Sequence, residues 1–180
     1  MLTLLSRHGY HRNILNQKYG RRPLRPNWAL GVIGMAYTLQ AVIAKSETFS
    51  EPLPQKLQVI RLRGGIDMLP LSTDALKVHE IPFCPLTDEG EKELPPQLLR
   101  LCEQLSKQCT LAYIEAEFFG GVGAQAHALF SEGKAIGQAI VSESAINNAL
   151  RYLGIAKGEA HDEFEAVGLG QHRDTDEWVA

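Results

Sequence analysis

The stretch Tyr113-Ile114-Glu115-Ala116-Glu117-Phe118-Phe119-Gly120-Gly121-Val122-Gly123-Ala124-Gln125 decides how the fold of this chain is interpreted. It places two carboxylates in an apolar and aromatic run, followed by three glycines within four positions. Runs of this kind that end in glycine are typical of a strand that leads into a turn or bulge. The stretch therefore predicts a strand over Leu111–Phe119 and a bent backbone beside a polar pocket.

Side chains alternate between the two faces of a strand, so Glu115 and Glu117 are expected on the same face. Two neighbouring carboxylates raise each other's proton affinity, which suits general acid–base catalysis or metal binding. The same pair also fits the solvated face of an edge strand. We predict that the ligand- or partner-binding surface consists of Tyr113, Glu115, Glu117, Gly120, Gly121, Gly123, Gln125, Arg173 and Asp174.

The pattern on either side of this stretch predicts further strands and two main helices. The expected strands are 37–43, 57–62, 126–130 and 134–141, the last two joined by a hairpin turn at Ser131-Glu132-Gly133. Residues 66–71 form a short apolar segment. The main helices are expected at 95–108 and 145–153, with shorter ones at 73–77 and 161–167. Strands that cluster around hairpins predict an α+β fold with a mainly antiparallel sheet and two main helices packed on one face.

The charge is unevenly distributed along the 180 residues. Residues 1–27 contain six basic side chains and no acid, whereas residues 158–180 contain seven acids and one base. We predict that residues 1–34 are a basic N-terminal extension, poorly ordered or upstream of the true start, and that 35–180 form a single domain. The net charge of -3 for the 180 residues argues against nucleic-acid binding by the whole chain. No nucleic-acid binding is expected for residues 35–180.

An uncharged run extends over the 17 residues from Trp28 to Ala44. A membrane-spanning helix needs about 20 mostly apolar residues. This run is shorter, and it contains Gly31, Gly34 and Gln40. The sequence therefore predicts no membrane span, although a membrane- or nucleic-acid-tethered protein that uses residues 1–44 stays open as an alternative.

No sequence signature of a cofactor or metal site is present. The three cysteines, Cys84, Cys102 and Cys109, lack a CxxC spacing, which is typical of reduced thiols in a cytoplasmic protein. Phe119–Gly123 lacks the Lys-Ser/Thr of a P-loop. We expect no cofactor and no metal.

The segment from Gln171 to Trp178 is dense in functional groups for a chain end. His172 is a candidate base, and Arg173 a candidate anion clamp. Glu115, Glu117 and His172 form one candidate catalytic set, which requires the tail to fold over the strand. A tail that is docked through Trp178, with its charges in solvent, is the alternative.

Three blocks of the sequence resemble an uncharacterised family of small bacterial proteins of cyanobacterial and actinobacterial type. The blocks are Ala112–Gln125, Ala145–Gly154 and Asp162–Arg173. The resemblance extends over Met35–Trp178 and excludes the basic extension. It implies a bacterial cytoplasmic protein and no mechanism.

The first interpretation is a non-catalytic cytoplasmic module that binds another protein, with an inhibitor- or immunity-type protein as one concrete form. An acidic surface around Glu115, Glu117 and Asp174 would speed association with a basic partner. The alternative is a small hydrolase or transferase in which Glu115 or Glu117 acts with His172 or Arg173. The oligomeric state is left open.

Overall fold

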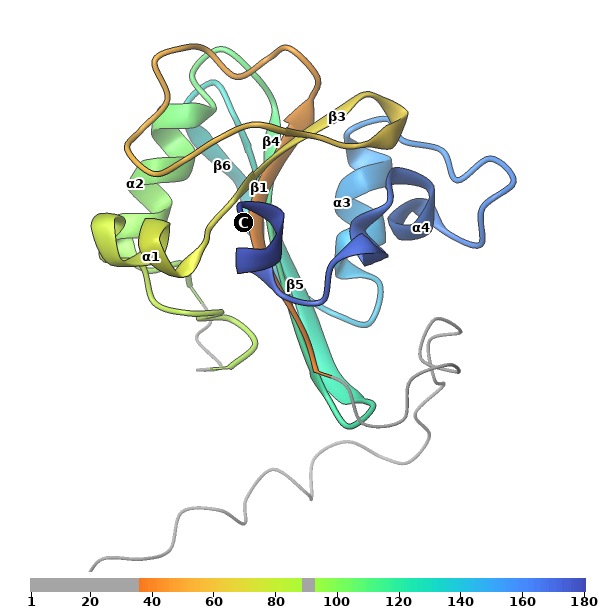
Figure 1. The fold of residues 1–180 in the computed structure, drawn as a ribbon. Helices are drawn as coiled ribbons and strands as arrows, with labels where there is room; N and C mark the ends of the chain where they lie inside the picture. Colours follow the sequence, from red (N-terminus) through yellow and green to blue (C-terminus); the bar gives the residue numbers. More distant parts are fainter. Residues whose placement is uncertain (1–35, 89–92) are drawn as a thin grey trace, which may run out of the picture. The chain divides into compact units, whose positions relative to one another are not determined.

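The structure is a computed structural model that describes residues 36–88 and 93–180 (Figure 1). Within these residues, six strands form one antiparallel sheet in the order β2-β3-β1-β4-β5-β6. The strands are β1 (Tyr37–Lys45), β2 (Ile60–Arg61), β3 (Ile66–Pro70), β4 (Leu111–Phe119), β5 (Val122–Ser131) and β6 (Lys134–Val141). The helices are α1 (Thr73–His79), α2 (Pro96–Leu105), α3 (Ala145–Tyr152) and α4 (Glu163–Val167), with 3-10 turns η2 (Arg63–Gly65), η3 (Leu169–Gln171) and η4 (Thr175–Trp178). The α+β class is confirmed.

Helices cover both faces of the sheet (Figure 1). Alternate residues of β1 enter two separate hydrophobic clusters, Leu39 and Ile43 in one and Val42 in the other. Helices α3 and α4 pack on the first cluster, and α1 and α2 pack on the second. The two main helices, α2 and α3, therefore lie on opposite faces of the sheet. The prediction that both pack on one face was wrong. The physical reason is that the middle of β1 and most of β4 are apolar on both sides, so both faces need a cover.

The central hairpins agree with the sequence prediction. Strand β4 has the predicted bounds, and Gly120-Gly121 joins it to β5 as a two-residue turn. A second turn at Glu132-Gly133 joins β5 to β6. Strand β5 begins four residues earlier than expected, at Val122, because it pairs with β4 over nearly its whole length.

The strand predicted at 57–62 is reduced to the two residues of β2. These two residues pair only with Asp67 and Met68 of β3. The chain reverses in η2 directly afterwards, where Gly64 has a φ of +73°. This turn ends the ladder on the Arg61 side, and residues 57–59 do not pair with β3.

The C-terminal tail docks on β1. Thr38 N donates to Arg173 O at 2.8 Å, and Gln40 N donates to Thr175 Oγ1 at 3.0 Å. β3 pairs with β1 only from Ala41 to Lys45, so the tail occupies the side of β1 that β3 leaves open. The docked-tail alternative thus describes the structure, with β1 as the docking strand.

Within residues 36–88 and 93–180, no helix has the length and apolar character needed to cross a membrane. The part of the uncharged run from Tyr37 to Ala44 lies in β1 at the centre of the sheet. The predicted extension, residues 1–34, lies outside the described residues.

Candidate functional site

Strand β4 presents its two carboxylates on the face that α1 and α2 cover. Glu115 lies directly opposite Gln40 of β1, so both side chains point to this face. Tyr113 lies two residues earlier on β4 and belongs to the cluster on the same side. The prediction that Tyr113, Glu115 and Glu117 share one face is thus confirmed by the register and the clusters.

Glu115 is fully buried and has hydrogen-bond partners from two parts of the chain. The Tyr113 hydroxyl donates to its Oε2, and Thr87 N donates to its Oε1 at 2.6 Å. Gln40 Nε2 in turn donates to the Tyr113 hydroxyl at 3.0 Å, and Gln40 Oε1 accepts from Cys84 N at 3.0 Å. These five residues form the buried polar cluster, in which the side chains of Gln40, Tyr113 and Glu115 are held by one another and by the backbone N atoms of Cys84 and Thr87.

Burial controls the protonation chemistry of this cluster. It raises the pKa of Glu115, while the hydrogen bonds from Tyr113 and Thr87 act in the opposite direction. Burial, followed by the nearby Glu115 charge, raises the pKa values of Tyr113 and of the Cys84 thiol. Because Cys84 N and Thr87 N donate to side chains of the cluster, the arrangement fixes the 81–88 loop to the sheet, and it encloses Glu115, which is fully buried.

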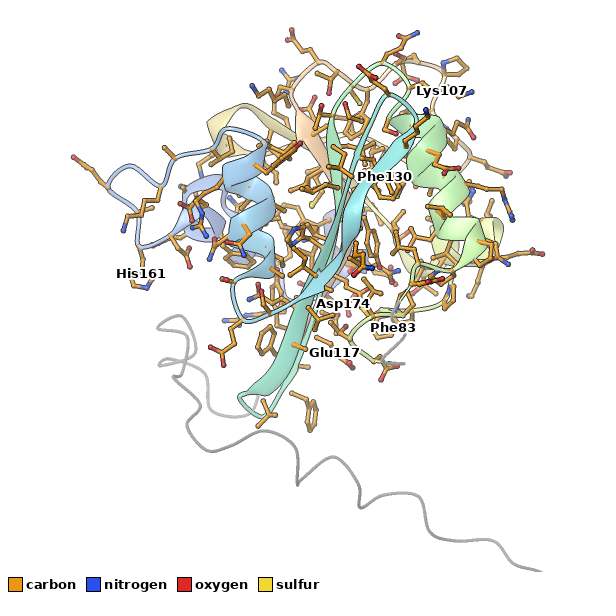
Figure 2. All side chains as sticks on the ribbon, turned by 180° about the vertical axis from the view of Figure 1, so that it is seen from behind. Phe83, Lys107, Glu117, Phe130, His161 and Asp174 are labelled. Atoms are coloured by element: carbon orange, nitrogen blue, oxygen red, sulfur yellow. The ribbon has the colours of Figure 1, made fainter. Side chains whose placement is uncertain are left out.

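Glu117 lies at the open end of this face. Its side chain is half buried, and burial followed by the Asp88 charge raises its pKa. Thr38 lies opposite Glu117 on β1, and its Oγ1 donates to Asp174 Oδ2 at 2.8 Å. Figure 2 shows Glu117, Asp174 and Phe83 at the same end of the sheet. Of the two carboxylates, Glu117 is therefore the one that can meet a partner.

The β4–β5 hairpin ends in an exposed apolar tip. Gly120 and Gly121 form its turn with φ values of +61° and +82°, a conformation that favours glycine at both positions. Phe119 and Val122 flank the turn and are 76% and 79% exposed. We call these four residues the hairpin tip, which projects from the rest of the sheet in Figure 1.

Gly123 is required by close packing within the hairpin. A Cβ atom at this position would lie 2.0 Å from Glu117 O and 2.6 Å from Phe118 Cα. Both atoms belong to the backbone, so they cannot move aside without shifting the strand. Gly123 thus sets the geometry of the tip and is not itself a binding group.

Gly123→Ala is expected to lower the free energy of unfolding by about 2 kcal/mol, because the added methyl group forces the strand ends apart. Chemical denaturation measures the loss, and amide hydrogen exchange should show it first at Phe118 and Val122. Ala124→Gly is the matched control. It removes a methyl group from the neighbouring residue and should lower the free energy of unfolding by about 0.5–1 kcal/mol. Equal stability of Gly123→Ala and the wild type would contradict the close packing.

Gln125 lies on the opposite face from Glu115. Its Oε1 accepts from Ile146 N at 3.2 Å and so holds the first turn of α3 against β5. His127, on the same side, is 3% exposed, and burial lowers its pKa. The sheet therefore separates Gln125 from the carboxylates with which the sequence had grouped it.

The tail does not bring His172 to the carboxylates. The His172 ring contacts Trp178 edge-on, with 4.5 Å between the ring centres, and its Nδ1 lies 3.8 Å from Glu177 Oε2. Asp174 caps η4 and binds Thr38, so its carboxylate is already engaged. The predicted set of Glu115, Glu117 and His172 shares no hydrogen-bond partner. In the described part of the chain, no group of three or more His, Cys, Asp or Glu residues is arranged to hold a metal ion.

Gln40, Thr87 and Cys84 were not singled out by the sequence. A glutamine in the middle of an apolar strand was the available signal for Gln40, since a buried amide needs partners. Thr87 and Cys84 carried no such signal, because they reach Glu115 and Gln40 only through the path of the 81–88 loop.

Two surface pockets lie away from this site. One, of about 360 Å³, lies between α1 and α2 and is lined by residues that include His79 and Arg100. The other, of about 440 Å³, lies between α2 and the β5–β6 hairpin and includes Leu94 and Ala139. Neither is lined by a residue that was predicted for the site.

Comparison of the chain with protein-family models, with curated proteins and with solved structures gave no match in any of the three. The resemblance of the three sequence blocks to a bacterial family therefore stays a prediction.

Proposed function

We propose that this chain is a non-catalytic, cytoplasmic module that binds another protein through the hairpin tip and the acidic residues beside it. The observation that carries the proposal is the exposure of Phe119 and Val122, at 76% and 79%. Large apolar side chains that lie together in solvent at the end of a hairpin are typical of binding surfaces.

The chemistry around the tip indicates what kind of partner it fits. Glu117 and Asp88 lie on the side of the sheet that α1 and α2 cover, and each raises the negative charge there. Phe83, 42% exposed, adds a further aromatic side chain at the same end (Figure 2). A partner with an apolar pocket and a basic rim complements this surface, as in an inhibitor- or immunity-type protein that neutralises a cationic enzyme.

The buried polar cluster supports the same proposal. A hydrolase or transferase that uses Glu115 needs an open path from this carboxylate to a substrate, whereas Glu115 is fully buried and bound to Tyr113 and Thr87. Tethering to a membrane or a nucleic acid through residues 1–44 would have to use the part before Tyr37, because β1 contains the remainder.

We expect the double variant Phe119→Ser/Val122→Ser to lose the partner while keeping the fold, because both side chains are in solvent. Tagged wild-type and variant proteins would be used to capture proteins from host lysate, with quantification by mass spectrometry. The amount of partner captured with the tip variant should be at least about tenfold lower than with the wild type, as expected for loss of an aromatic anchor. It should persist with the control Val59→Ser/Val78→Ser, whose parent side chains are 37% and 42% exposed.

Charge provides a second arm of the same experiment. Glu117→Lys should weaken the captured complex, and added salt should weaken the wild-type complex, since the partner is basic. Two results would contradict the proposal: a capture profile that is the same for the tip variant and the wild type, or a small-molecule thermal shift that disappears in Glu117→Gln. The second result would favour an enzyme.

A further inference from the structure

Strand β6 forms one edge of the sheet, with only β5 as a neighbour in the described part of the chain. Ile136, Ile140 and Val141 are 37%, 47% and 52% exposed. In Figure 2 the strand lies on the near side of the sheet, between α2 and α3. Exposed edges are usually protected by charges, by proline or by a β-bulge. Between Lys134 and Glu143 the sequence contains no charge and no proline, and the strand carries a bulge at its centre.

The residues of β6 are symmetric about Gln138. In an antiparallel pair centred on Gln138, Ile136 of one strand meets Ile140 of the other, and Ala135 meets Val141. Each contact then occurs twice, which is the property of an interface with a two-fold axis. Apolar cross-strand pairs of this kind stabilise a sheet.

The charges at the two ends of β6 specify the same orientation. Lys134 begins the strand, and Glu143 follows its end, both exposed. Antiparallel pairing centred on Gln138 places Lys134 of each copy opposite Ser142 of the other, one residue from Glu143, whereas parallel pairing places Lys134 beside Lys134. Charge complementarity therefore favours a second copy in the antiparallel orientation.

The irregular part of the strand lies at the centre of this pattern. The pairing of β6 with β5 is interrupted between His127 and Leu129, and Gly137 has a φ of +71°. A bulge bends the edge locally and leaves the ladder on each side intact. Two pairing arms, each joining 134–136 of one copy to 140–142 of the other, lie outside the bulge.

We propose that β6 is a self-association surface, on which two copies of the chain pair their β6 strands antiparallel about a two-fold axis at Gln138. The two sheets then continue into one another. This surface is separate from the hairpin tip, so the dimer leaves the tip free for another protein.

Sedimentation velocity of the full chain from about 1 to 200 µM tests the proposal. For the wild type we expect a monomer–dimer equilibrium that depends on concentration. Ile140→Lys should raise the dissociation constant of the dimer at least about tenfold, because two-fold symmetry introduces the substitution twice. The control is Val78→Lys, which changes a side chain of similar exposure, 42% against 47%, on α1. It should leave the equilibrium unchanged, and equal melting temperatures would show that both variants fold.

Charge exchange tests the orientation without altering the apolar contacts. Lys134→Glu alone places two carboxylates side by side at each junction, and Glu143→Lys alone places two ammonium groups there, so each variant should associate less than the wild type. An equimolar mixture of the two variants should associate again whichever way the strands run, so the two single variants are the test of the orientation.

The pairing in that mixed dimer can be followed residue by residue. The Lys134→Glu copy carries a carboxylate at both ends of its β6, and the Glu143→Lys copy carries an ammonium group at both ends. Each junction of the mixed dimer therefore joins opposite charges. A monomer at about 200 µM, well above the range in which specific dimers form, would overturn the proposal. The proposal would also be overturned if Ile140→Lys and the two charge variants dimerised as strongly as the wild type.

Discussion

Glu115→Ala is expected to lower the free energy of unfolding by about 3–5 kcal/mol. The substitution leaves the Tyr113 hydroxyl and Thr87 N as buried donors without their acceptor, and it opens a cavity between β4 and the 81–88 loop. Each unsatisfied buried group costs about 1–3 kcal/mol, and the cavity adds to this loss. Urea denaturation followed by circular dichroism measures the change.

Glu117→Ala is the matched control, because Glu117 lies two residues along the same strand and face but is half buried. We expect it to change stability by less than about 1 kcal/mol. Equal losses for the two variants would contradict the assignment of Glu115 as the structural carboxylate and Glu117 as the accessible one.

The same carboxylate makes stability depend on pH. Burial raises the pKa of Glu115 above its ordinary value of 4.5, so between the two values the native state binds a proton that the unfolded chain releases. The stabilising contribution is complete below pH 4.5 and is lost as the pH rises through the native pKa.

In Glu115→Gln the side chain is neutral at every pH. The free energy of unfolding of this variant, relative to that of the wild type, should therefore increase as the pH rises from about 4.5. The pKa of Glu117 is raised as well, and Glu117→Gln separates its contribution. A stability difference between Glu115→Gln and the wild type that stays constant from about pH 4 to 8 would contradict the buried charge.

Trp178→Ala is expected to cost about 3 kcal/mol, near the lower end for a buried aromatic residue, because a chain end can relax around the gap. Trp178 is 9% exposed and belongs to the cluster that β1, α3 and α4 share. Its loss should release the tail from β1. The amides of Thr38 and Gln40, which donate to Arg173 O and Thr175 Oγ1, should then exchange faster with solvent.

Hydrogen exchange with mass spectrometry and thermal unfolding together measure this effect. Val179→Ala, a half-buried neighbour, serves as the control and should cost less than about 1 kcal/mol. If Trp178→Ala left the exchange of residues 37–40 unchanged, the packing of Trp178 would not be what holds the tail in place.

Much of the local structure could be predicted from the sequence. Strand β4, the turn at Gly120-Gly121 and the β5–β6 hairpin follow from alternating side chains and paired glycine signals, which act over a few residues. The common face of Glu115 and Glu117 follows in the same way, because the period of a strand is two.

The surroundings of these residues could not be predicted in the same way. Glu115 and Glu117 are equivalent in the pattern, yet one is fully buried and the other is half buried. The difference arises in part from the 81–88 loop, in which Thr87 N donates to Glu115, whereas Glu117 has Asp88 as its charged neighbour. Likewise, the placement of α2 and α3 on opposite faces depends on which cluster each helix joins.

The α+β class, the antiparallel hairpins and the side-chain alternation along β4 follow from the order of the residues. The tertiary structure alone decided that Glu115 is enclosed, that Gln125 lies behind the sheet and that the tail pairs with β1 and leaves His172 beside Trp178. The physical reason is range: strand period and turn chemistry act between near neighbours, whereas burial and hydrogen-bond pairing join residues up to 137 positions apart.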